Sequence, residues 1–249
     1  MMPLAVLGAT GNLGRRVAAQ ALAHGHPLSV AVRSRNKLAA DIAARAHVRE
    51  LDLEAASVDA LAHFIGGHEA LICCAGQVAD GDRFVALIDK VVSAIETLPA
   101  AHRPVSWFMA GAALLPLDER GRRGVDLPKV RNTYWPHARN LERLQRSTLD
   151  WRLLCPGPMV DKPALVPGRL RLAIEGLASP LPSLARHLPA PLLLPLFAAK
   201  VPELIVSYDD AANVMLRHLS PAGEMSRCRV GLALPVGMRG QKDQWTSGA

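Results

Sequence analysis

The chain has 249 residues, of which half are hydrophobic and only 4% aromatic, so Ala, Leu and Val must supply most of its core. This length suits one domain with at most a small lobe, and we expect a single domain over residues 1–249. The net charge of +7 points to anionic partners. However, the basic residues are scattered without interleaved aromatic residues, which argues against nucleic acid and favours an anionic small molecule.

The cysteines and the apolar tracts bear on whether the chain is a disulfide-rich, metal-binding or membrane protein. Four cysteines do not make a disulfide framework in a chain this long. Cys73 and Cys74 are interpreted as two buried, inert hydrophobic residues, with a redox or metal pair as the alternative. No CxxC or His-rich spacing is present, so we expect no metal. The longest apolar tract, 190–199, is too short to span a bilayer. No signal pattern is recognisable at the N-terminus, and we expect a cytoplasmic protein.

Through the first half of the chain, short apolar runs alternate with segments of helical period. This is the pattern of parallel strands joined by crossover helices. In chain order we expect strand 3–8, helix 12–24, strand 28–32, helix 36–45, strand 48–53, helix 57–64, strand 70–75, helix 83–98 and strand 104–109. The sequence therefore predicts an α/β fold with a Rossmann-like, doubly wound parallel sheet.

The second half is less regular and rich in proline. In chain order we expect a surface loop 117–130, helix 133–148, strand 151–155, short strand 204–207, helix 209–219, strand 229–234 and a polar, frayed tail 239–249. Between Pro156 and Pro202 the chain carries ten of its nineteen prolines. This density predicts that no long helix and no central strand forms there. Because the leucines between the prolines require burial, 157–203 is expected to be an inserted lid or substrate lobe over the carboxyl edge of the sheet.

A glycine-rich run stands between the first strand and the first helix: Gly8-Ala9-Thr10-Gly11-Asn12-Leu13-Gly14. Gly8 would permit the sharp turn, Gly11 the approach of a pyrophosphate, and Gly14 the close packing of helix on strand. The phosphates would then meet free amides at a helix N-terminus. A glycine-rich turn without a ligand is the alternative, but the strand–helix–strand context favours a dinucleotide.

The end of the second strand bears on the choice of dinucleotide. NAD-selective folds place an acidic side chain there, whereas this sequence has Arg33, with Arg35 and Lys37 nearby. A guanidinium matches a 2′-phosphate, so NADP(H) is expected to be preferred over NAD(H), with an exposed basic loop as the alternative. Further cofactor contacts are expected after the third and fourth strands, at Asp52, Leu53, Ala75 and Gly76.

These features occur together with the segments Leu149-Asp150-Trp151-Arg152-Leu153-Leu154-Cys155-Pro156-Gly157-Pro158 and Ile205-Val206-Ser207-Tyr208-Asp209-Asp210-Ala211-Ala212. The combination resembles the atypical short-chain dehydrogenases. Within them it is most similar to NAD(P)H-binding proteins related to flavin reductase/biliverdin-IX-beta reductase and to the NmrA-like group. The resemblance covers residues 3–160 well and 204–235 loosely, and it does not cover the proline-rich insert.

The resemblance identifies candidate catalytic positions and also departures from the family. Ordinary short-chain dehydrogenases use a Tyr-xxx-Lys pair, in which the lysine lowers the pKa of the tyrosine. Here Tyr134 is followed four residues later by Ala138. Gly111 stands where the flavin-reductase type has a serine, and His137 where that type has a histidine. Tyr134 and His137 are the candidate catalytic residues, although an exposed helix histidine is an equal alternative.

Hydride transfer requires a nicotinamide held against an acceptor and needs no acid or base from the protein. We therefore expect an NADP(H)-dependent oxidoreductase that reduces a flat small-molecule acceptor such as a flavin or quinone. Two alternatives remain. One is a non-catalytic, NmrA-like sensor of NADP(H), and the other is an isomerising or dehydrating enzyme acting on a nucleotide-sugar-like substrate. The sequence does not indicate the oligomeric state.

Overall fold

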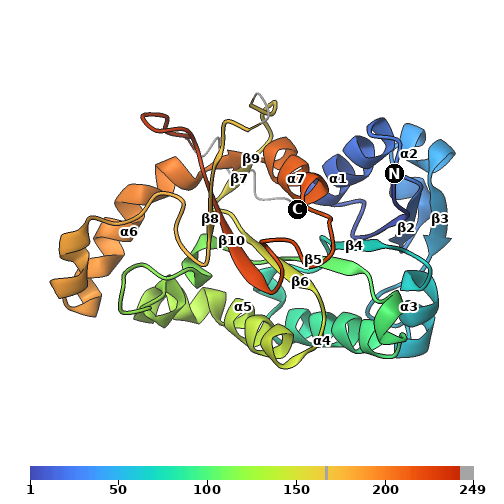
Figure 1. Ribbon diagram of the computed structural model, residues 1–249, viewed down its shortest axis with the longest axis horizontal. Coiled ribbons are helices and arrows are strands. Elements are labelled where there is room, and N and C mark those ends of the chain that lie inside the picture. Colours follow the sequence, from blue (N-terminus) through green and yellow to red (C-terminus); the bar gives the residue numbers. More distant parts are fainter. Residues whose placement is uncertain (166–167, 242–249) are drawn as a thin grey trace.

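An eight-stranded sheet runs through the molecule and carries helices on both faces (Figure 1). The computed structural model describes residues 1–165 and 168–241. In spatial order the strands are β3 His47–Glu50, β2 Leu28–Val32, β1 Leu4–Leu7, β4 Ala70–Cys73, β5 Val105–Met109, β6 Trp151–Cys155, β10 Cys228–Ala233 and β8 Arg171–Ile174. All neighbours pair in parallel except β8, which runs antiparallel to β10. This confirms the predicted Rossmann-like fold.

Two layers of helices bury the two faces of the sheet. One layer is α1 Asn12–Ala23, α2 Ala40–Arg45 and α7 Tyr208–Arg217; the other is α3 Val58–Ile65, α4 Asp82–Glu96 and α5 Pro128–Arg146. Successive residues of a strand point to opposite faces. In β1, Val6 accordingly packs under the first layer and Leu7 under the second. The strand order reverses between β1 and β4, where open α/β sheets bind ligands at the carboxyl ends of their strands.

The predicted strands at 28–32 and 151–155 have the observed bounds, but two of the predicted helices begin several residues away from the expected position. The helix expected at 36–45 is a single 3-10 turn, Arg35–Lys37, followed by α2. The backbone is extended at Leu38, whose side chain is only 9% exposed and packs under α1. Burial of this leucine therefore interrupts the helix. The helix expected from residue 133 begins instead at Pro128. Proline is well suited to a first helical turn, because an N–H there would have no acceptor within the helix and its absence costs no hydrogen bond.

The prediction that no long helix forms in the proline-rich segment is wrong. Helix α6, Ala190–Leu204, has 15 residues and includes Pro195 and Pro202. Pro191 lies in the first turn, where its missing N–H costs no hydrogen bond within the helix, and Pro202 lies in the last turn, where it disturbs the helix least. Burial of Leu193, Phe197 and Leu204 stabilises the helix in spite of Pro195.

The rest of this segment adds two short strands that the sequence did not reveal, β7 Met159–Val160 and β8. Strand β7 pairs with β9, Val206–Ser207, which lies within the strand expected at 204–207, and β8 extends the main sheet at its edge. Edge positions tolerate nearby prolines, since one side of the strand needs no partner. The role of 157–203 as a lid stays a prediction. From residue 242 on, the expected frayed tail lies outside the described residues.

Candidate functional site

The glycine-rich run forms a tight turn between β1 and α1. Gly8 has a φ of +79°, and a Cβ at this position would lie 2.8 Å from the backbone nitrogen of Ala75. At Gly14 a Cβ would lie 2.0 Å from the carbonyl oxygen of Gly8. A larger residue at either position would therefore force the backbone to shift. Around a Cβ at Gly11, the nearest atom is the Gly8 oxygen at 3.4 Å, so the protein leaves the space beside Gly11 free.

The N-terminus of α1 faces this space. Gly11 is the N-cap, no side chain caps the helix, and its first turn has no acidic residue. Unsatisfied amides and the helix dipole favour an anion at such an end. Leu13 is only 6% exposed and packs in the core, so its side chain is not available to a ligand.

A cleft of about 360 Å³ opens at the carboxyl ends of the strands. It is lined by Gly8, Thr10, Gly11, Ala31, Val32, Arg33, Leu51, Asp52, Leu53, Glu54, Cys74, Ala75, Gly76, Gln77, Asp80 and Leu87. The structure thus brings together eight of the eleven predicted cofactor residues. Asn12, Leu13 and Gly14 do not line the cleft. Sequence reasoning missed Glu54, Gln77 and Asp80, although each closely follows a strand end that had been singled out.

The rim of the cleft carries Arg33, whose side chain is exposed. Within residues 1–165 and 168–241 no acidic side chain forms an ion pair with Arg33. Arg35 is engaged elsewhere: its Nη2 donates to the carbonyl of Ala43 at 2.8 Å. Among the acidic residues of the cleft, Glu54 is paired with Arg83 at 2.7 Å. Arg33 is therefore the basic side chain of the cleft that is free to meet an anion.

The two candidate catalytic residues lie together on α5. The rings of Tyr134 and His137 are stacked with their centres 6.1 Å apart, and a Cβ at Gly111 would lie 3.7 Å from His137 Nε2. Phe84 of α4 meets His137 edge-on at 5.7 Å. The Phe84 ring also packs against Gly76 of the cleft lining, since a Cβ at Gly76 would lie 2.4 Å from it. The candidate catalytic pair does not itself line the cleft, and Phe84 lies between Gly76 and His137.

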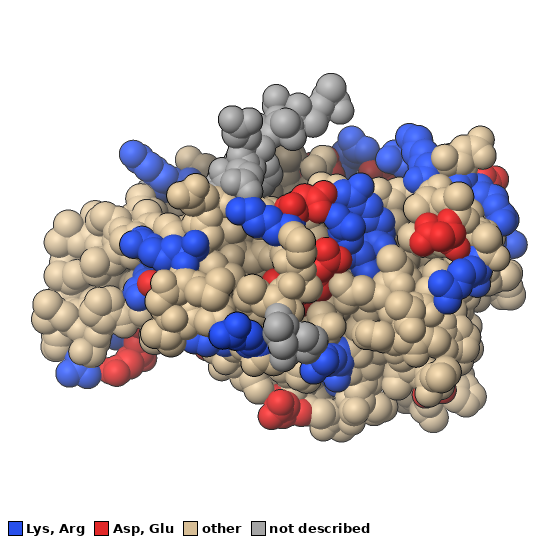
Figure 2. Space-filling model, turned by 90° about the horizontal axis from the view of Figure 1, so that it is seen from above, with Lys and Arg blue, Asp and Glu red and all other residues tan. Residues whose placement is uncertain are grey.

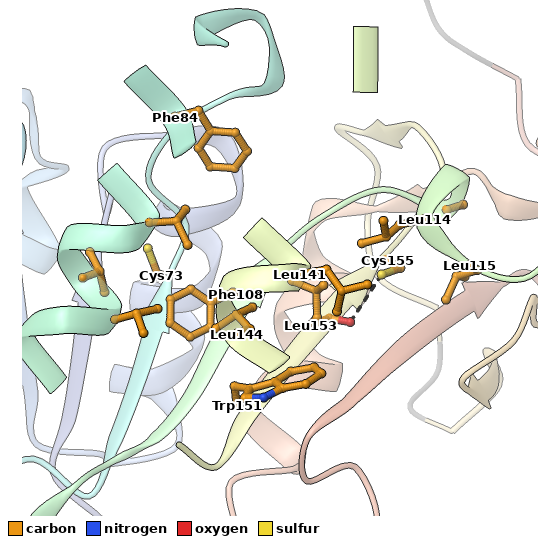
Figure 3. Packing of buried hydrophobic residues seen from close by; sticks show 14 of the residues in the cluster. Cys73, Phe84, Phe108, Leu114, Leu115, Leu141, Leu144, Trp151, Leu153 and Cys155 are labelled. Atoms are coloured by element: carbon orange, nitrogen blue, oxygen red, sulfur yellow. Dashed lines mark hydrogen bonds between the residues drawn. The ribbon is translucent and has the colours of Figure 1, made fainter. Parts of the chain in front are cut away.

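Phe84 stands at one end of a buried apolar layer that continues past Phe108 and Leu144 to Trp151 (Figure 3). The layer lies between the sheet and helices α4 and α5. It fixes the spacing of these helices, and therefore the position of the α5 residues that face Gly111.

His137 is buried, with 8% of its surface exposed, which contradicts the alternative of an exposed helix histidine. Burial without a charged partner lowers its pKa to about 4, so the ring is neutral at physiological pH. Its Nδ1 has no hydrogen-bond partner among the described residues. The same holds for both amide atoms of Asn140, one turn further along α5. Sequence reasoning missed Asn140; its spacing of three from His137 on a helix was the available signal.

The adjacent cysteines differ in their surroundings. Cys73 is buried in the core, and burial raises the pKa of its thiol to about 11. Cys74 is only partly buried and lines the cleft, although desolvation raises its pKa as well. The prediction that both are buried is therefore wrong for Cys74, because β4 ends at Cys73 and the next residue enters the site. Their lack of reactivity stays a prediction.

The proline-rich segment contacts the surroundings of the site at two places. Asp161, after β7, is paired with Arg16 and with Arg15 on α1, the latter at 3.2 Å. Arg122, in the loop after β5, donates to the carbonyls of Leu188 at 2.7 Å and Ala185 at 3.0 Å. On the face shown in Figure 2, basic side chains lie beside acidic ones and do not form a continuous basic patch.

Residues 8–179 match a family described as NAD(P)H-binding. The chain belongs to this NAD(P)H-binding family. The match contains the whole cleft and the Gly111–His137 region, so a nicotinamide dinucleotide is its cofactor class, as predicted. The preference for NADP(H) stays a prediction. No curated protein matches the sequence.

Solved structures share the fold at low sequence identity. A proposed NADH-flavin reductase from Streptococcus pneumoniae is 23% identical with a TM-score of 0.69, covering 94% of this chain and 100% of that one. ChuY, an anaerobillin reductase from Escherichia coli O157:H7, is 17% identical with a TM-score of 0.63, covering 94% and 98%. A Rossmann-fold NAD(P)-binding protein from Shigella flexneri is 15% identical with a TM-score of 0.63, covering 98% and 99%.

In the part of the present chain that the structure describes, none of the helices is long and apolar enough to cross a membrane.

Proposed function

We propose that this protein is an NADP(H)-dependent reductase of a flat, small-molecule acceptor such as a flavin or quinone. The observation that carries the proposal is the cleft, in which the glycine-rich run after β1, Arg33 and Gly76 line one continuous surface. A dinucleotide extended along it would have the pyrophosphate beside Gly11, the 2′-phosphate beside Arg33 and the nicotinamide directed past Gly76 toward His137. Structural neighbours named as flavin and anaerobillin reductases are consistent with such acceptors.

Bound NADPH would supply the hydride. The residues of this chain would do the rest: the amides at the start of α1 would bind phosphate, Phe84 would hold Gly76 and His137 in place, and His137 and Tyr134 would border the acceptor. Water would provide the proton that a reduced flavin or quinone takes up. This chemistry requires neither the serine replaced by Gly111 nor the lysine replaced by Ala138.

The preference for NADP(H) is tested at Arg33. A charge-assisted hydrogen bond contributes about 1.5–3 kcal/mol, and an exposed ion pair about 0.2–1 kcal/mol. Between these limits, NADPH should bind about 10 to 100 times more tightly than NADH, and the ratio should fall as salt rises. Arg33→Asp should invert the preference, because it places a carboxylate against the phosphate. Arg35→Ala is the matched control, since that guanidinium already binds Ala43. Calorimetric titration with both cofactors gives the ratios; equal wild-type affinities would contradict the proposal.

The reductase activity is tested by NADPH oxidation with purified protein across a panel of flavins, quinones and carbonyl compounds. Steady turnover with a flat acceptor is the expected result. Tight NADPH binding without turnover on the whole panel would instead support the second candidate, an NmrA-like sensor. Gly111 and Ala138 favour that candidate, since each lacks a group that related enzymes use.

A further inference from the structure

The space over Gly111 is bordered by two aromatic side chains from α5. Outside the two neighbouring residues of the chain, the atoms nearest to a Cβ there would be His137 Nε2 at 3.7 Å and His137 Cδ2 and Tyr134 Cε1 at 3.9 Å. These are ordinary van der Waals distances, so a Cβ would fit without a clash. Because residue 111 is glycine, His137 Nε2 faces this space without an intervening group from the protein.

The hydrogen-bonding pattern determines which nitrogen of His137 carries the proton. Nδ1 is buried and has no partner among the described residues. A buried N–H without an acceptor costs more than a buried lone pair, because unpaired donors are rarely tolerated. We therefore assign the proton to Nε2, the nitrogen on the side of Gly111.

The surroundings of His137 also keep it uncharged. The rings packed against it are Phe84 of α4 and Tyr134 of its own helix, and Gly111 borders it from the loop after β5. Of these only Tyr134 is titratable, and none is a carboxylate that would stabilise an imidazolium ion. A neutral imidazole in this position donates a hydrogen bond without transferring its proton.

We infer that the space over Gly111 is the acceptor-oxygen subsite, in which the neutral Nε2–H of His137 donates a hydrogen bond to a carbonyl oxygen of a conjugated acceptor. The inference rests on the proposed function and narrows its substrate class to flat molecules with a carbonyl conjugated to the hydride-accepting atom. In the reaction, NADPH gives a hydride and becomes NADP⁺. The acceptor gains the electron pair, its oxygen becomes more negative, and water protonates the product. The hydrogen bond from His137 strengthens as that charge develops.

Binding to the complex with NADP⁺ tests the subsite independently of turnover. Riboflavin and a simple naphthoquinone serve as probes, titrated by fluorescence or calorimetry against wild type, His137→Leu, His137→Gln and Gly111→Ser. We expect His137→Leu to weaken binding of at least one probe about tenfold or more, the loss of one hydrogen bond. His137→Gln should restore most of it, since a glutamine amide can donate from the position of Nε2.

Gly111→Ser is the variant that does not depend on changing His137. Its Cβ fits without a clash, so the fold should survive, but its hydroxyl would enter the subsite and bond to Nε2. Probe binding should fall about tenfold while NADPH affinity is unchanged. Probe binding that is absent in wild type, or equal in wild type, His137→Leu and Gly111→Ser, would overturn the inference. Probe binding without NADPH oxidation would contradict the proposed reductase and leave the subsite standing.

Turnover provides a second readout where it occurs. Because His137 is a neutral donor, kcat should change little between pH 5.5 and pH 8. His137→Leu should lower kcat more than it raises KM for NADPH. A wild-type rate that follows the titration of a group near pH 6.5, lost in His137→Gln, would show that His137 is a general acid and overturn the inference.

Discussion

His137 is a buried base that folding holds neutral, and this has a consequence for stability. Its pKa is about 4 in the folded protein and near its ordinary value of 6.5 when unfolded. The unfolded state therefore takes up an additional proton as pH falls between these values, and the folded state loses stability over that range. Once the pH is below both pKa values, the shift lowers the free energy of unfolding by about 3 kcal/mol.

The contribution of His137 appears in the difference between wild type and His137→Gln. The free energy of unfolding of wild type should fall by about 3 kcal/mol more than that of the variant between pH 7.5 and pH 4. Urea denaturation at a series of pH values measures this difference. Parallel curves for the two proteins would show that His137 titrates normally in the folded state.

At the scale of one element, Gly11 and Gly14 in the turn from β1 into α1 are glycine for different reasons. A side chain at Gly14 would collide with the Gly8 carbonyl at 2.0 Å, whereas one at Gly11 would meet only free space and that oxygen at 3.4 Å. Gly11→Val should fold and lose dinucleotide binding, because its methyl groups would occupy the proposed position of the pyrophosphate. Gly14→Ala should lower stability, by about 1–3 kcal/mol for an overpacked position. Thermal unfolding and NADPH titration of both variants distinguish the roles; unchanged NADPH affinity in Gly11→Val would refute the placement of the pyrophosphate.

Helix α6 is held to the sheet through the carboxylate of Glu203. It accepts hydrogen bonds from Ser179 at 2.5 Å, Lys200 at 3.0 Å and Arg171 of β8 at 3.1 Å. Led by the bond from Ser179, these contacts lower the pKa of Glu203 to about 2. The stabilisation is present above pH 4.5 and lost as pH falls from there toward 2.

Removing this charge should loosen the attachment of α6. At pH 7, Glu203→Gln should lower the free energy of unfolding by about 1–3 kcal/mol, the range for hydrogen bonds to a charged group. The deficit should shrink as pH falls below 4.5. Glu119→Gln is the control, because Glu119 is 71% exposed and pairs with Arg186 at the surface. Equal effects of the two substitutions would show that Glu203 does not anchor the helix.

At the scale of the whole molecule, cofactor binding should stabilise the folded chain, since the cleft exists only when β1, β2 and β4 are assembled. NADPH at 100 times its Kd should add about 2.7 kcal/mol to the free energy of unfolding. For a domain of this size that raises the Tm by about 5 to 10 °C. NADH at the same concentration should raise it less. Differential scanning fluorimetry measures both shifts, and Gly11→Val should abolish them; a shift that persists in this variant would place the binding site elsewhere.

Patterns of residues close in sequence were sufficient to predict several features of this protein. Strands β2 and β6 have the predicted bounds because an apolar run followed by a turn signal is decided by neighbouring residues. The roles of Gly8 and Gly14 also followed from their spacing, and the backbone contacts at both positions agree with it. Arg33 was found in the same way, from its place directly after a strand.

Other features depended on contacts between distant parts of the chain. The prolines of α6 predicted no helix, yet burial of Leu193 and Phe197 against the rest of the molecule outweighs the hydrogen bonds that those prolines remove. The burial of His137 and Asn140 and the opening of Cys74 into the cleft also came from packing alone.

The sequence by itself therefore determined the fold class, the glycine-rich turn between β1 and α1 and most of the candidate residues along the cleft. Only the tertiary structure decided that Phe84, Gly111 and His137 meet, and that this histidine is buried and uncharged. The physical reason is the range of the forces involved. Turn geometry and strand pattern depend on residues close in sequence, whereas burial and the pKa depend on every element packed around a side chain.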